Sequence, residues 1–335
     1  EQGGIQTIPP TLQQSLMARL DRLGPAREVA QVGSVIGRDF SYALLHAVAG
    51  MDDAALQAVL ERLADADILL VQGLPPDSDY RFKHALIQDA AYENLLKSRR
   101  QVLHRRVAEI LRDKFADSVA AEPELLAHHF TLAGLTEAAF VWWAKAGQQS
   151  LERSALAEAA EQLTRALTQI AALSATPALR REQIKLQVAL ITPLIHVKGY
   201  AAPETKAAVE RARLLIEQAE ALGEPPEDPL LLFSVLFGLW AANVLAFNGD
   251  VCLDLAAHFL TLAEKQGATI PLMVGHRNMG ASLFYAGDIA QSRVHYDRAI
   301  ALYDPAEHRP LATRFSADVR VVLLSYRSWA LWLLG

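Results

Sequence analysis

The sequence predicts a mainly α-helical protein in which a small module of helices and two short strands precedes a long run of paired helices. Apolar residues recur three and four positions apart over most of the chain, which is the spacing of an amphipathic helix. Short apolar runs typical of strands occur only at 68–71 and 80–82. Beyond residue 82 almost nothing alternates with period two, so we expect helices from there to the end.

Composition narrows the classes of protein that the chain can represent. Of its 335 residues 52% are hydrophobic and 21% are charged, which excludes a disordered chain. Its net charge of -6 does not favour general nucleic-acid binding, which needs a basic face. The single Cys252 excludes a disulfide framework and fits a reducing compartment, so we expect a cytoplasmic protein.

The two ends of the sequence suggest that it is part of a longer polypeptide. The first residues, from Glu1, carry neither the basic stretch nor the apolar run of a signal peptide, and no initiator methionine is present. The last residues, 333–335, fall inside an apolar helical pattern. We therefore expect residues 1–9 to be a linker from a missing upstream domain and the helical region to be truncated at its C-terminus.

The first module is expected over residues 10–115. Helices are predicted from Thr11 to Leu23, over 26–36, from an opening at 39–41 to about 50, and over 53–67, with Thr11 and Asp52 as caps. Strands follow at 68–71 and 80–82, joined by the proline-rich turn 73–77. Three or four small helices followed by two short strands are the outline of a winged-helix domain, with the turn as the tip of a two-stranded wing.

The remaining chain, residues 120–335, is predicted to be a tetratricopeptide-like α-solenoid. Helices expected over 85–97 and 98–115 complete the first module. Helices over 122–134, 137–150 and 155–173 and further antiparallel pairs then continue to the end. Small and aromatic residues match the tetratricopeptide pattern in two copies, because small residues let helices approach closely. The matching residues are Trp143, Gly147, Ala159 and Ala166 in one copy, and Gly280, Tyr296 and Ala299 in the other. Residues 175–270 fit this pattern poorly, and a generic helical bundle is the alternative.

No catalytic motif occurs in the sequence. It has no Gly-Lys dipeptide for a P-loop, no Gly-x-Gly-x-x-Gly turn and no His-Glu-x-x-His pair. His128 and His129 are adjacent, and neighbours on a helix point about 100° apart, so they do not naturally share a metal. We therefore expect no enzyme activity, no metal and no cofactor within these residues.

The segment from Phe82 to Tyr92 is the most informative candidate site. It follows the second predicted strand and opens a helix, which places His84 at or near the helix N-terminus. Backbone N–H groups and the helix dipole favour an anion there, so His84 could touch a phosphate held by another domain. A capping or buried structural histidine is the alternative.

This segment carries a resemblance to a known family. The motif Phe82-x-His84-x-x-x-Gln88-Asp89 at the junction of wing and helix resembles the corresponding motif of STAND-type signalling ATPases. The wider chain resembles bacterial predicted ATPases, some of which are fused to a class III adenylate or guanylate cyclase domain. Segments 8–12, 18–23, 84–92 and 99–104 carry this wider resemblance, with residues 296–302 and 325–335 resembling the repeats of those ATPases.

The resemblance implies a regulatory role. In that family the winged-helix histidine faces the nucleotide phosphates across a domain interface and stabilises the closed, ADP-bound state. His84 would do so here, with Phe82, Gln88 and Asp89 as the supporting motif and with ATP or ADP and Mg²⁺ bound by an ATPase domain missing from this sequence. An unknown protein or small ligand on the repeats would shift the closed and open states, and oligomerisation on activation stays open.

Two other functions are considered alongside this sensor role. A tetratricopeptide adaptor would use the winged helix only as a structural cap. A DNA-binding regulator would use the basic cluster between residues 97 and 106 to contact phosphates. That cluster follows the wing rather than occupying the usual recognition helix, so an intramolecular or solvated role is favoured over DNA. Its members are Lys97, Arg99, Arg100, Arg105 and Arg106.

The uncharged run 229–249 meets the length test for a membrane span. Its flanks are acidic, with no nearby lysine or arginine to orient insertion, and Ser234, Asn243 and Asn248 interrupt it. We therefore expect a buried solenoid helix and no membrane partner.

Overall fold

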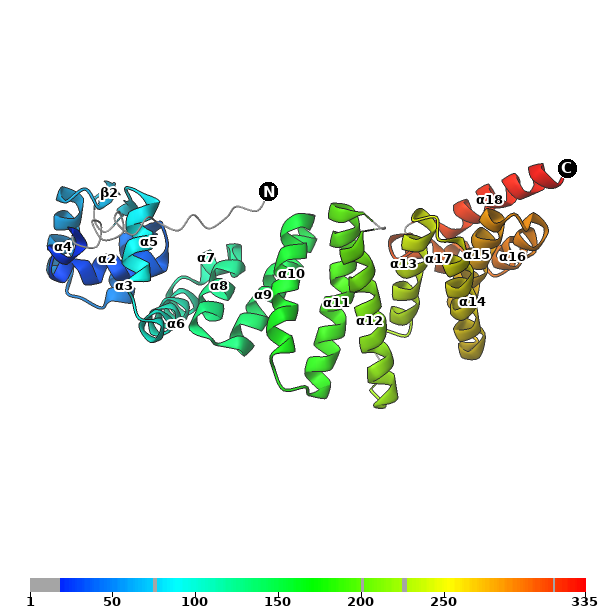
Figure 1. Cartoon of the computed structure of the whole chain (residues 1–335), viewed down its shortest axis with the longest axis horizontal. Helices are drawn as coiled ribbons and strands as arrows, with labels where there is room; N and C mark the ends of the chain where they lie inside the picture. Colours follow the sequence, from blue (N-terminus) through cyan, green and yellow to red (C-terminus); the bar gives the residue numbers. More distant parts are fainter. Residues whose placement is uncertain (1–18, 75–76, 200–201, 225–227, 316) are drawn as a thin grey trace. The chain divides into compact units, whose positions relative to one another are not determined.

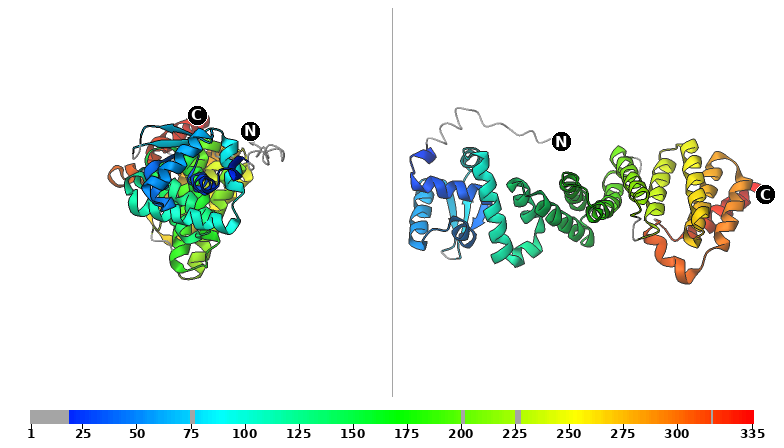
Figure 2. Two further views of the ribbon diagram at one scale, coloured as in Figure 1. Left: turned by 90° about the vertical axis from the view of Figure 1, so that its left-hand side faces the viewer. Right: turned by 90° about the horizontal axis from the view of Figure 1, so that it is seen from below.

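The computed structural model describes residues 19–74, 77–199, 202–224, 228–315 and 317–335. The chain divides into two compact units, residues 1–146 and 147–335, with the boundary inside one helix. Each unit is described by itself (Figures 1 and 2). The expected linker 1–9 and most of the helix expected from Thr11 lie outside the described residues.

The first unit begins with helices gathered around a small sheet (Figure 1). Ser41 and Asp52 cap two of the helices, because their side chains accept hydrogen bonds from the amides of Leu44 and Ala55, both at 3.2 Å. The elements are α2 (Pro25–Ile36), β1 (Asp39–Ser41), α3 (Tyr42–Ala49), α4 (Asp53–Asp65), β2 (Leu69–Gln72), β3 (Asp79–Phe82), α5 (Ala85–Glu93) and α6 (Lys97–Lys114).

The sheet has three antiparallel strands in the order β1-β3-β2, where the sequence predicted two. The additional strand, β1, pairs Phe40 with Tyr80 and Ser41 with Asp79 of β3. Residues 39–41 were expected to open a helix, but the helix starts one residue later because Ser41 is its cap. Three residues are too few to show an alternating pattern, so only the pairing with β3 reveals this strand.

Three further helices complete the first unit: α7 (Ala116–Ala121), α8 (Pro123–Ala133) and the first part of α9 (Thr136–Glu152). Helix α8 packs against α6. Trp143 on α9 is buried, and its indole Nε1 donates a hydrogen bond of 2.9 Å to Thr131 Oγ1 on α8. The polar edge of the indole is therefore satisfied inside the helix pair.

The described residues of the second unit contain helices and no strand, and each helix from α10 to α15 packs against the next one along the chain (Figure 1). The predicted mainly α-helical fold, with solenoid-like packing, is confirmed. The elements are α10 (Leu156–Ala171), α11 (Pro177–Lys198), α12 (Pro203–Ala221), α13 (Leu231–Leu245), α14 (Gly249–Gln266), α15 (Thr269–Ala286), α16 (Ile289–Ala301), α17 (Pro305–His308), the 3-10 helix η1 (Arg309–Thr313) and α18 (Val319–Leu334).

Glycines mark the closest approach of neighbouring helices in this unit. A Cβ added to Gly147 would lie 2.7 Å from Leu163 Cδ2, and one added to Gly280 would lie 2.7 Å from Tyr296 Cε1. Both pairs are sixteen residues apart. The other predicted repeat residues, Ala159, Ala166 and Ala299, are fully buried. The same small-to-bulky contact thus recurs at the same spacing in two helix pairs.

Helix α13 accounts for most of the uncharged run 229–249. Its residues are divided between two hydrophobic clusters, with Phe237 and Trp240 in one and Val235 in the other. By length and composition no single helix among the described residues could cross a membrane, and one sharply bent pair, α3 with α4, passes that test. Helix α13 is apolar around most of its circumference because it packs against other helices on two sides.

The close contact at Gly280 can be tested by a single methyl group. Gly280→Ala is expected to lower the free energy of unfolding by about 1–3 kcal/mol, because the added Cβ overlaps the fully buried Tyr296 ring. Gly249→Ala is the matched control, since no atom lies within 4 Å of its added Cβ. Urea unfolding followed by circular dichroism measures both; equal midpoints would show that the ring moves aside without cost.

Candidate functional site

His84 is the N-cap residue of α5, and its side chain is exposed and makes no capping hydrogen bond. The two structural roles considered for His84 were a side chain that caps the helix and a buried histidine. The imidazole does neither, because it accepts no hydrogen bond from the first turn and is exposed. The preceding Lys83 is engaged elsewhere, since its Nζ lies 2.6 Å from Asp67 Oδ1 and lowers the pKa of that carboxyl. His84 immediately precedes the first turn of α5, whose backbone N–H groups favour an anion.

The other motif residues differ in what they contact. Phe82 is fully buried on β3 and packs edge-on against Phe40, with ring centroids 5.9 Å apart. Gln88 Nε2 donates a hydrogen bond of 3.3 Å to the carbonyl of Ser34 at the end of α2. Asp89 is exposed. Packing thus explains Phe82 and Gln88, whereas His84 and Asp89 face solvent.

The five basic residues between 97 and 106 do not form one surface. All lie on α6, and successive residues of a helix are turned by about 100°, so their side chains point in different directions around it. Arg100 lies 4.9 Å from the centroid of the Tyr92 ring, and its Nε donates a hydrogen bond of 2.9 Å to the Leu95 carbonyl. Arg105 pairs with Glu109 at 2.8 Å. Arg100 and Arg105 have structural partners, whereas Lys97 and Arg99 are exposed.

A buried chain of aromatic side chains joins α5, α6 and α8. Tyr92 Oη lies 3.0 Å from His104 Nε2, and His104 Nδ1 lies 2.8 Å from His129 Nδ1. If Tyr92 donates to His104, then neutral His104 donates from Nδ1 and His129 accepts, which satisfies every contact without a charge. Three or more metal-binding side chains do not meet anywhere in the described ranges.

Burial keeps both histidines neutral. Desolvation, reinforced by His128 and Arg100, lowers the pKa of His104 to about 4. Desolvation also lowers the pKa of His129 to about 3, with His104 and His128 adding to the effect. The sequence singled out only the adjacent pair 128–129, because the partner at 104 is brought there by the packing of α6 on α8.

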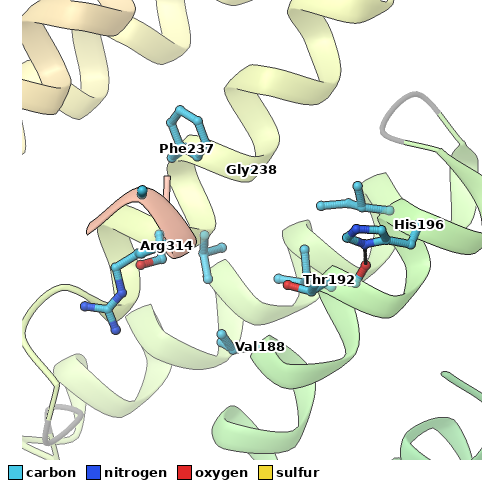
Figure 3. Close-up of a pocket in the computed structure, with 11 residues that line it drawn as sticks. Val188, Thr192, His196, Phe237, Gly238 and Arg314 are labelled. Atoms are coloured by element: carbon cyan, nitrogen blue, oxygen red, sulfur yellow. Dashed lines mark hydrogen bonds between the residues drawn. The ribbon is translucent and has the colours of Figure 1, made fainter. Parts of the chain in front are cut away.

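The second unit contains a cavity of about 350 Å³ between α11, α13 and the segment after η1 (Figure 3). Ile191 and Val235 supply apolar walls, while Thr192 and His196 on α11 supply polar groups. His196 Nδ1 donates a hydrogen bond of 2.9 Å to the Thr192 carbonyl, which leaves Nε2 available to a ligand. A pocket whose lining is about equally polar and apolar fits a small amphipathic molecule.

Arg314 is one of the residues that line this cavity. It forms an ion pair and hydrogen bond with Asp228, at the turn that precedes α13, so the segment after η1 is fastened across the end of that helix. In Figure 3 the Arg314 guanidinium points away from His196. Sequence reasoning missed this pocket because its walls come from segments that are distant along the chain and share no motif.

Comparison with known proteins finds a sequence relative that covers most of this chain. No family model matches the chain. A protein of Rhizobium meliloti (strain 1021) described as uncharacterized is 29% identical over 325 residues, which cover 96% of this chain and 30% of that protein. The chain therefore spans less than a third of the length of this relative.

Two solved structures align with most of the chain at low similarity. One is a Signal Transduction ATPase with Numerous Domains (STAND) protein with a tetratricopeptide repeat sensor from Pyrococcus horikoshii, with a TM-score of 0.33 and 8% identity over 91% of this chain and 53% of that one. The other is BtubC from P. vanneervenii, with a TM-score of 0.29 and 13% identity over 87% of this chain and 94% of that one. Likeness at these TM-scores supports no conclusion about function.

The buried histidine pair predicts a loss of stability in mild acid. In the unfolded chain both histidines bind protons near pH 6.5, whereas in the folded chain they stay neutral down to about pH 4. The unfolded state therefore binds more protons in this window, and the free energy of unfolding falls by up to about 1.4 kcal/mol per pH unit for each histidine as pH falls. Carboxylates with lowered pKa, such as Asp67, lose their contribution only at lower pH.

Urea midpoints measured at pH 7 and pH 5 test this dependence. His129→Gln is expected to reduce the difference between the two midpoints, because one titrating group is removed while the amide oxygen can still accept from His104. His46→Gln is the control, since the His46 side chain is 41% exposed and outside the buried chain. The same pH difference in wild type and His129→Gln would contradict the assignment.

Proposed function

We propose that this chain is the regulatory and sensor region of a STAND-type signalling ATPase and has no catalytic activity of its own. The first unit docks on a nucleotide-binding domain that lies elsewhere in the same polypeptide. His84 contacts the phosphates of ADP, bound there with Mg²⁺, and favours the closed state. A ligand or partner on the helical repeats then shifts the balance between the closed and open states.

The exposed position of His84 carries the proposal. A histidine at the start of a nine-residue helix that neither caps the helix nor packs in the core has an imidazole available to an external group. The amides of the first turn and the positive end of the helix dipole favour a phosphate there. Phe82 and Gln88 support this arrangement by fixing β3 and α5 to the core.

The cavity of the second unit is the proposed binding site for the ligand that regulates the ATPase. The cavity walled by α11 and α13 combines apolar surface with the Thr192 hydroxyl and His196 Nε2. Because one of its walls is the segment held by the Arg314–Asp228 pair, a bound molecule would alter the contacts of that segment. We do not propose a cyclase domain, because no described residue supports one. A role in binding DNA is not favoured, because the basic residues of α6 are dispersed around the helix.

The test uses the polypeptide that includes the proposed nucleotide-binding domain. His84→Ala is expected to weaken ADP binding about tenfold, the loss of roughly one charge-assisted hydrogen bond to a phosphate. ATP binding should change less if His84 acts only in the closed state. Isothermal titration calorimetry with each nucleotide and Mg²⁺ measures both affinities.

His46→Ala is the matched control, because His46 is also a partly exposed histidine of the first unit but lies on α3. Unchanged ADP affinity in His84→Ala would refute the phosphate contact. The absence of a P-loop from the same polypeptide would refute the wider proposal and leave an adaptor built on the repeats.

A further inference from the structure

A second cavity of the second unit, of about 200 Å³, is lined by residues of α13, α15, α16 and α18. Aromatic side chains from each of these helices contribute to its wall: Phe237 and Trp240, Tyr285, Tyr296 and Tyr326. Among the described lining residues it shares only Phe237 with the cavity of Figure 3. The two cavities are therefore separate sites.

The α13 side of this aromatic cavity is held in place by contacts with the core. Trp240 Nε1 donates a hydrogen bond of 2.9 Å to Ser282 Oγ, which itself donates one of 3.2 Å to the Cys252 carbonyl. The Phe237 ring packs edge-on against the fully buried Phe315, with ring centroids 5.4 Å apart. Because these rings are already ordered, a ligand that packs on them does not bear the cost of ordering them.

Arg277 gives the aromatic cavity a positive charge. This residue lines the cavity and is only 7% exposed. Its Nη1 donates a hydrogen bond of 3.1 Å to the Phe315 carbonyl, and its guanidinium carbon lies 5.0 Å from the centroid of the Phe237 ring. A guanidinium stays charged in proteins, and charges interact strongly where water is excluded. The cavity therefore favours a ligand with a negative group.

Tyrosine hydroxyls supply hydrogen-bond donors beside this charge. Tyr296 is fully buried, and its hydroxyl has no hydrogen-bond partner among the described residues. Burial raises the pKa of Tyr296 and raises the pKa of Tyr326 to about 12, while the charge of Arg277 acts in the opposite direction on both. Both hydroxyls therefore keep their protons at neutral pH. Since Arg277 acts on both tyrosines, the charge and the donors lie on the same side of the cavity.

We propose that this cavity binds a small carboxylate that carries one aromatic ring. The ring packs against Phe237 and Trp240, and the carboxylate accepts a hydrogen bond from Tyr296 Oη beside the charge of Arg277. A cavity of about 150 Å³ can hold benzene, so this larger one has room for a ring and a carboxylate. Tyr285 is 59% exposed, and rotation of its side chain gives a ligand access to the buried hydroxyl.

This inference is independent of the proposed ATPase role, since it depends only on the residues of the aromatic cavity. Benzoate and phenylacetate are the probes, and benzamide and phenylacetamide are their neutral counterparts of similar shape. Isothermal titration calorimetry on the full-length protein should show saturable binding of a carboxylate, at least about tenfold tighter than binding of its amide. No saturable binding of either carboxylate, or equal binding of acid and amide, overturns the proposal.

Tyr296→Phe tests the hydroxyl, because it keeps the ring that packs on Gly280. Carboxylate binding should weaken about tenfold, the loss of roughly one charge-assisted hydrogen bond. The melting temperature of the ligand-free protein should not fall, since the hydroxyl that is removed has no partner among the described residues. Tyr80→Phe, at a buried tyrosine of the first unit, is the matched control and should leave the affinity unchanged. Unchanged affinity in Tyr296→Phe contradicts the proposed contact.

Ala241→Leu tests whether the probe occupies the aromatic cavity. Ala241 lines the cavity and is half-buried, so a leucine there takes up ligand volume with little disturbance of the core. Binding should weaken about tenfold or more, whereas Ala257→Leu, at an exposed alanine of α14, should leave it unchanged. Circular dichroism checks that both variants unfold at the wild-type temperature. Equal binding by the two variants would place the probe elsewhere and overturn the proposal.

Discussion

The close approach of helices at small residues is the constraint on which the second unit depends. Gly147 against Leu163 and Gly280 against Tyr296 leave no room for even a methyl group without movement of a buried side chain. Apolar burial alone would hold helices together in many registers, but a small residue opposite a bulky one selects a single register. The spacing of sixteen residues between the glycine and the bulky residue therefore reflects one packing register that both helix pairs share.

The first unit depends on a different anchor, the burial of Phe82 at the end of β3. Because β3 is the central strand, its pairing with β1 and β2 fixes the direction in which the chain leaves the sheet. Gln88 then ties the following helix to α2. Phe82 and Gln88 thus hold β3 and α5 in place, and His84 lies between them at the start of α5 without a capping hydrogen bond from its side chain.

Buried and partly buried polar side chains in both units form hydrogen bonds or ion pairs with nearby side chains. The buried chain of Tyr92, His104 and His129 needs no net charge when the histidines are neutral, and burial enforces that state by lowering their pKa values. Arg314 and Asp228 instead form an ion pair at a partly exposed position, where water still solvates them. The first arrangement links stability to pH, whereas the second fastens the wall of a cavity.

The sequence by itself determined the helical class, most helix positions and the two longer strands, because periodicity, caps and turn residues act over a few residues. It also marked Gly147, Gly280 and Tyr296 as repeat residues and placed His84 at a helix start. Only tertiary structure decided the strand at 39–41, the pairing of His104 with His129 and the cavity beside α13. Each of these depends on contacts between segments far apart along the chain, which local spacing does not record.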